Sequence, residues 1–220
     1  MPRAARIVQP GVPHHITQRG VRRMQVFFTD EDYQLYMKLL GIFASRANSS
    51  VLAWCLMPNH VHLMVVPQDL DGLRATIAPL DAAYAQEINK REGWTGHLWQ
   101  SRFASFPMDP YYSSAAARYI ELNPVRAGIV EDPAFYRWSS ASAHLTGESD
   151  GITDLHASRE ITDDWPGLLA SGLDDRSLDL FRKHELTNNP LGSKPFIKQL
   201  EQEHGRSLHT LSRGRPKKEE

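Results

Sequence analysis

Apolar and polar side chains alternate over residues 60–66, H-V-H-L-M-V-V. Because successive side chains of a strand point to opposite faces, one face carries His60, His62 and Met64. The other face is apolar and consists of Val61, Leu63 and Val65. A further apolar run, residues 51–57, is separated from this one only by Pro58 and Asn59. The pattern predicts a β-hairpin whose apolar face packs under helices.

Other stretches carry the helical period. Apolar residues at helical spacing follow the acidic opening T-D-E-D and predict a helix over 30–47. The remaining expected elements are a strand over 12–18, a helical region over 69–91 that Pro79 should break or kink, a strand over 98–108, a helix from 110 to about 123, a short helix over 135–145 and an amphipathic helix over 195–204. This order predicts an α+β, ferredoxin-like domain in which helices cover one face of an antiparallel sheet and leave the other face free for a site.

Composition refines the domain picture. The 220 residues carry a net charge of −1, but arginines gather before residue 25 and acids gather in a Gly- and Ser-bearing middle segment. We expect a main domain over 1–145, an acidic, loop-rich linker over 146–180 and a C-terminal helix with a basic tail over 181–220. One cysteine allows no internal disulfide, and no apolar run reaches membrane-spanning length. We therefore expect a cytoplasmic protein with no membrane partner.

The histidine pair of the predicted strand is a candidate metal site. His60 and His62 share a face, so the two imidazoles project close enough together to hold one divalent ion. A pair with this spacing is also common as satisfied structural or surface groups, and the pattern alone favours that interpretation.

A second candidate feature lies in R-Y-I-E-L-N-P-V-R-A, residues 118–127. Tyr119 and Asn123 are four residues apart, which on one helix sets a phenol beside an amide oxygen. The phenol is a candidate nucleophile and the amide a candidate third ligand. Alternatively, Tyr119 is a core residue and Asn123 ends the helix before a proline. Tyr111 and Tyr112, in the first turn of the same predicted helix, are competing nucleophiles.

Three ordered motifs resemble a known family. These are M-P-N-H-V-H-L-M-V (57–65), G-H-L-W-Q-S-R-F (96–103) and A-R-Y-I-E-L-N-P-V-R-A-G-I-V (117–130). With P-G-V-P-H-H-I-T-Q-R-G before them, they are similar to the single-tyrosine HUH transposases, specifically the REP-associated tyrosine transposases, over about residues 5–145. The tail elements P-L-G-S-K-P-F-I-K-Q-L-E and R-G-R-P-K-K are similar to the ends of that branch.

The resemblance implies a HUH endonuclease fold with a catalytic-tyrosine helix on the site face of the sheet. It implies that His60, His62 and Asn123 hold Mg²⁺ or Mn²⁺, although asparagine reaches less far than the glutamine of some relatives. It further implies that Tyr119 cleaves single-stranded, hairpin-forming repetitive DNA through a 5′-phosphotyrosine, as a monomer or a homodimer. Two alternative functions remain open. The protein could be a non-catalytic nucleic-acid-binding protein on the same fold, or a metal-dependent hydrolase in which water, rather than tyrosine, attacks the phosphate.

Arginines offer candidate DNA contacts, although each is equally compatible with a solvated surface charge. The candidates are Arg19, Arg22, Arg23, Arg102, Arg118 and Arg126, with Arg213 and Arg215 in the tail. The tail element is similar to short segments that enter A·T-rich minor grooves. An ordinary basic end explains it nearly as well.

Overall fold

The sheet at the centre of the molecule has four antiparallel strands in the order β2-β3-β1-β4. The computed structural model describes residues 5–208. The strands are β1 (His14–Arg19), β2 (Ser49–Met57), β3 (His60–Pro67) and β4 (Ala104–Pro107). β2 and β3 form the predicted hairpin, in which Met57 pairs with His60. β1 pairs with both β3 and β4 and so occupies an interior position.

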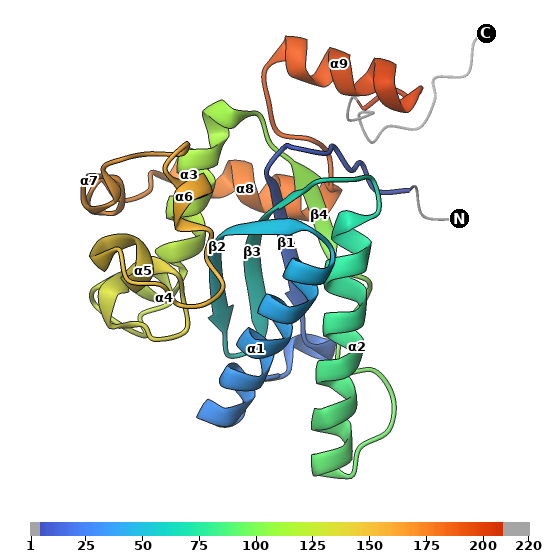
Figure 1. The fold of residues 1–220 in the computed structure, drawn as a ribbon, viewed down its shortest axis with the longest axis vertical. Coiled ribbons are helices and arrows are strands. Elements are labelled where there is room, and N and C mark those ends of the chain that lie inside the picture. The colour runs from blue at the N-terminus through green and yellow to red at the C-terminus, as the bar shows by residue number, and fades with distance from the viewer. Residues whose placement is uncertain (1–4, 209–220) are drawn as a thin grey trace, which may run out of the picture.

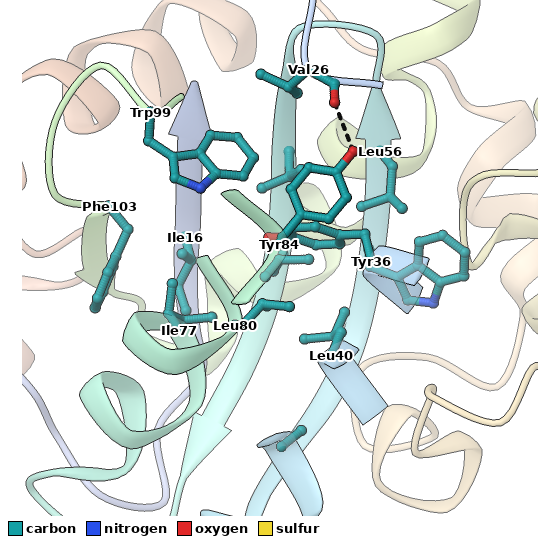
Figure 2. Packing of buried hydrophobic residues seen from close by; sticks show 14 of the residues in the cluster. Ile16, Val26, Tyr36, Leu40, Leu56, Ile77, Leu80, Tyr84, Trp99 and Phe103 are labelled. Carbon is teal, nitrogen blue, oxygen red and sulfur yellow. Dashed lines mark hydrogen bonds between the residues drawn. The ribbon is translucent and has the colours of Figure 1, made fainter. Parts of the chain in front are cut away.

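Two long helices, α1 (Asp30–Arg46) and α2 (Gly72–Glu92), cover one face of the sheet (Figure 1). The predicted opening of α1 is confirmed, since the Asp32 carboxylate accepts the backbone N–H of Thr29 at 3.1 Å. The apolar face of β3 packs into the core beneath these helices. Figure 2 shows this core, with Tyr36 and Leu40 from α1 meeting Leu80 and Tyr84 from α2.

α2 runs without interruption through Pro79, so the predicted break in this region is wrong. Pro79 lies on the partly exposed side of the helix, while Ile77, Leu80 and Tyr84 are fully buried at helical spacing. Proline removes one backbone donor, but the buried apolar face continues on both sides of it. The hydroxyl of Tyr84 also donates to the Val26 carbonyl at 2.6 Å, which fixes the second half of the helix (Figure 2).

The opposite face of the sheet carries α3 (Pro110–Glu121) and α8 (Asp175–Thr187), which lie behind the sheet in Figure 1. A second core forms there, in which Met64 and Phe106 of the sheet meet Ile120 and Phe181 of the helices. The architecture is therefore α+β with a tyrosine-bearing helix on the second face, as expected. The other short elements are η1 (Val21–Arg23), α4 (Asn123–Arg126), η2 (Pro133–Phe135), α5 (Ala141–Thr146), α6 (Leu155–Ser158), α7 (Trp165–Ala170) and α9 (Lys194–His204).

Three local expectations differ from the structure. The strand expected over 98–108 is regular only in β4, because Leu98, Trp99 and Phe103 instead fill the first core. The helix expected over 135–145 is replaced by η2 and α5. The segment expected to be a loop-rich linker holds α6, α7 and the first turns of α8, and its Trp165 is buried in the second core. Within residues 5–208, no helix combines the length and apolarity that crossing a bilayer requires.

Candidate active site

The two histidines of β3 project from the face opposite α1 and α2. Val61 and Leu63 are fully buried in the first core, whereas Met64, on the histidine face, belongs to the second. His62 is 2% exposed and His60 is half-buried. Their rings meet edge to face, with centroids 4.9 Å apart. The predicted alternation along β3 is confirmed, and it places both imidazoles on the sheet face that carries α3 and α8.

A third histidine, His15 of β1, joins this pair. β1 pairs with β3 so that Thr17 lies opposite His62, which leaves His15 as a diagonal neighbour on the same face. The Nε2 atom of His15 lies 3.0 Å from Nδ1 of His62, and the two rings stack with centroids 5.2 Å apart. Sequence reasoning missed His15. Its place in P-H-H-I-T-Q predicted a strand, but not which strand lies beside it.

A carboxylate from α8 completes the cluster. Oε1 of Glu185 lies 3.5 Å from Nδ1 of His62 and 3.8 Å from Nε2 of His15. Candidate ligand atoms of these three residues all lie within 4.8 Å of one another. Glu185 was also missed by sequence reasoning, because no helix was expected over 175–187. The available signal was Asp174, whose side chain caps α8, followed by Leu178 and Phe181 at helical spacing.

Tyr119 approaches the same cluster from α3. Its ring centroid lies 5.7 Å from those of His15 and His62. Glu185 of α8 is close enough for its charge to act on the Tyr119 hydroxyl. Phe181 of α8 packs against the ring at 4.9 Å, and Tyr119 is only 4% exposed. Tyr119 is therefore the tyrosine that the structure brings to the histidines, whereas Tyr111 is 81% exposed at the start of α3.

Arg126 covers another side of Tyr119. Its guanidinium carbon lies 4.2 Å from the centroid of the tyrosine ring, and Nη1 donates to the Tyr119 carbonyl at 3.1 Å. The ring is thus held between a cation on one side and the Phe181 ring on another. Sequence reasoning named Arg126 as a candidate DNA contact and gave it no relation to Tyr119.

Asn123 does not share one continuous helix with Tyr119, so that expectation is wrong. α3 ends at Glu121, and Asn123 is the first residue of α4, after the cap residue Leu122. Pro124 at the second position of α4 has no backbone N–H, so the regular ladder of α3 stops before it. Asn123 is 7% exposed. Its role as a metal ligand stays a prediction.

The C-terminal end of α3 is held by a buried polar network. Oε1 of Glu121 lies 2.6 Å from Nδ1 of His144 in α5 and also accepts the hydroxyl of Ser140. The His144 ring stacks on Trp165 of α7, with centroids 3.6 Å apart. The segment expected to be a linker therefore supports the helix that carries Tyr119.

Burial sets the electrostatics of the cluster. It lowers the pKa of His15 and of His60 to about 3, with nearby arginines adding to the effect, and it lowers the pKa of His62 well below its ordinary value. Burial raises the pKa of Glu185 to about 7. Burial, followed by the charge of Glu185, raises the pKa of Tyr119 to about 12. The imidazoles are consequently neutral at physiological pH, which is the form that binds metals.

These residues fit a divalent metal ion. Two imidazole nitrogens and a carboxylate oxygen within 4.8 Å of one another form a donor set that such ions accept. Within residues 5–208, Oε1 of Glu185 is buried without a hydrogen-bond partner, as expected of an atom meant for a further ligand. This set, His15, His62 and Glu185, shares only His62 with the predicted set of His60, His62 and Asn123.

The candidate DNA-contacting arginines are spread over several elements. Arg22, Arg23 and Arg102 are exposed, and Arg19 is half-buried at the end of β1. Arg118 donates from Nη1 to Ser171 beyond α7. Arg213 and Arg215 lie outside the described residues.

Comparison with known proteins agrees with this fold and with the motifs. The model of the family "Transposase IS200 like" matches residues 10–123. The solved structure of a REP-associated tyrosine transposase bound to a REP hairpin is 19% identical, with a TM-score of 0.55 over 74% of this chain and 94% of that one. A putative transposase from Deinococcus radiodurans R1 is 22% identical, with a TM-score of 0.37 over 55% of this chain and 96% of that one. A search of curated proteins found no match.

The family match covers β1, the histidine strand and α3, and it ends at Asn123. The fold of this chain, a four-stranded antiparallel sheet with helices on both faces, matches that of the REP-associated relative. The chain belongs to the IS200-like transposase family.

Proposed function

We propose that the protein cleaves and rejoins single-stranded, hairpin-forming repetitive DNA, as a REP-associated tyrosine transposase. The observation that carries the proposal is the convergence of the Tyr119 ring on His62 and His15, whose ring nitrogens lie beside the Glu185 carboxylate. A candidate nucleophile, a proton acceptor and candidate metal ligands thus form one cluster. The REP hairpin bound by the structural relative supports the choice of substrate.

Cleavage in this proposal is a transesterification. The Tyr119 oxygen attacks the scissile phosphorus, and its proton passes to the Glu185 carboxylate, whose charge acts on this hydroxyl. The bond from phosphorus to the 3′-oxygen breaks, and that oxygen takes a proton from solvent. The products are a 5′-phosphotyrosine and a free 3′-hydroxyl. Rejoining is the reverse reaction, in which a 3′-hydroxyl attacks the phosphotyrosine.

A divalent ion, Mg²⁺ or Mn²⁺, is part of the proposal. His60 and His62 would hold it, with Asn123 or Glu185 as the oxygen ligand. When bound, such an ion offsets the charge that develops on the phosphate oxygens. Glu185 takes the proton of Tyr119 in the step above, so Asn123 is the oxygen ligand in this proposal.

Binding of DNA requires phosphate contacts beyond this cluster. We propose that Arg22, Arg23 and Arg102, which are exposed, contact the DNA backbone. Arg213 and Arg215 would add a second contact from the tail. The protein would act in the cytoplasm as a monomer or a homodimer.

The test is covalent capture of DNA. A single-stranded hairpin oligonucleotide labelled at its 3′ end is incubated with protein and Mn²⁺, then resolved under denaturing conditions. We expect a labelled protein–DNA adduct that Tyr119→Phe abolishes, because only a phenol oxygen can form the ester. Tyr111→Phe and Tyr112→Phe are matched controls and should keep the adduct. Cleavage without an adduct would show attack by water, and binding without cleavage would show a non-catalytic protein.

A further inference from the structure

The side chain of Asn59 lies between the candidate ligand His60 and the turn η1. Its Nδ2 donates to the carbonyl of Arg23 at 3.1 Å, and its Oδ1 lies 2.6 Å from Nδ1 of His60. Asn59 occupies the two-residue connection of the β2–β3 hairpin, directly before His60. One amide group therefore contacts both the strand that carries the histidine pair and the segment that carries two exposed arginines.

The two contacts of Asn59 determine the protonation of the His60 ring. The carbonyl of Arg23 can only accept a hydrogen bond, so the amide nitrogen of Asn59 must face it. The amide oxygen must then face His60, and that oxygen also only accepts. Nδ1 of His60 consequently carries the proton and donates it. In a neutral imidazole this leaves the lone pair on Nε2, at the far side of the ring.

The turn on the other side of Asn59 is held in a conformation that isolated residues avoid. Arg22 and Arg23 both have positive φ, 54° and 63°. Two such non-glycine residues in succession persist only where their surroundings fix them. Asn59 supplies two of the restraints, its side-chain bond to Arg23 and its carbonyl, which accepts the Gly20 N–H at 2.9 Å. Both arginine side chains are exposed.

We propose that Asn59 is a positioning residue that fixes His60 as the Nδ1–H tautomer and ties it to the arginine turn. Its effect on cleavage rests on the proposed function above, whereas its effect on the ring does not. The ring then keeps its lone pair on Nε2, the nitrogen on the side away from Asn59, and does not exchange between tautomers. The turn that carries Arg22 and Arg23 and the histidine strand then move as one unit, because the side chain and the carbonyl of Asn59 hold both.

The first test reads the tautomer directly, in full-length protein without added metal. Nitrogen chemical shifts of ¹⁵N-labelled histidine show which ring nitrogen of His60 carries the proton. We expect Nδ1–H in the wild type and in Asn59→Asp, which keeps an oxygen acceptor. In Asn59→Ala the population should shift to the Nε2–H form that free imidazole side chains favour. Asn89→Ala, which removes a similar bond from an amide to the Gly96 carbonyl, is the matched control and should leave His60 unchanged.

A wild-type His60 with its proton on Nε2, or the same tautomer in wild type and Asn59→Ala, would overturn the proposal. Amide spectra of each variant establish that it is folded, and Asn59→Asp gives a second comparison if Asn59→Ala is not. These outcomes do not depend on cleavage, so a failure of the proposed function is distinguishable from a failure of this inference.

A second test uses the adduct assay. Loss of a hydrogen-bond partner to a ligating histidine typically lowers metal affinity about 10- to 100-fold. We expect Asn59→Ala to raise the Mn²⁺ concentration needed for half-maximal adduct formation by roughly that factor, and Asn59→Asp to keep it near the wild-type value. Asn59→Asp loses the donor to Arg23, so it should still weaken binding of the oligonucleotide. An equal Mn²⁺ requirement in Asn59→Ala and wild type would contradict the positioning role.

Discussion

Asp81 gives the protein a stability that falls as the pH rises. This carboxyl is 8% exposed in α2, and its Oδ2 accepts the side-chain amide of Gln18 at 2.8 Å. Burial raises its pKa to about 7, against the opposing effects of Gln18 and of the charge on Arg6. Because the pKa in the folded protein lies above the unfolded value of 3.8, the folded state holds a proton that the unfolded state has already lost.

The size of the effect follows from these two pKa values. They differ by about 3, which corresponds to roughly 4 kcal/mol in the free energy of unfolding. The contribution is fully present below the unfolded pKa, declines as the pH rises from about 4, and is lost once the pH passes the folded pKa of about 7. Asp81→Asn cannot ionise, so it should become progressively more stable than the wild type across this window.

Urea unfolding followed by tryptophan fluorescence at intervals from about pH 4 to pH 8 measures the difference. Asp179→Asn is the matched control, because the side chain of Asp179 is 80% exposed in α8. Its replacement should therefore leave the pH dependence of the free energy of unfolding unchanged. A stability difference between Asp81→Asn and wild type that stays constant over this pH range would refute the reasoning.

Two further predictions concern the support of Tyr119. Phe181→Ala should lower the free energy of unfolding by about 3–5 kcal/mol in urea titrations, since Phe181 is fully buried, while Leu186→Ala, 85% exposed on the same helix, should change it little. Equal losses in the two variants would contradict the packing described. Arg126→Met should slow adduct formation by roughly tenfold, because a contact between a cation and an aromatic ring contributes about 0.5–2 kcal/mol. Arg137→Met removes the similar contact with Trp138, so a comparable slowing there would point to a general loss of stability.

The relatedness to transposases could be predicted from the sequence, because the patterns that indicate it involve residues close together in the chain. The alternation through Val61, Leu63 and Val65 fixed the face of His60 and His62, and the apolar spacing of 30–47 fixed the first helix. Each of these patterns depends on residues a few positions apart. The family motifs are local in the same way.

The tertiary structure alone decided which distant groups meet. His15 reaches His62 because β1 lies beside β3, and Glu185 reaches both because α8 packs on the second face of the sheet. The continuity of α2 through Pro79 was likewise decided by packing, which outweighs local propensity when a buried face continues. The sequence by itself determined the strand that carries His60 and His62 and identified Tyr119. Strand order and helix packing decided that His15 and Glu185 lie beside them.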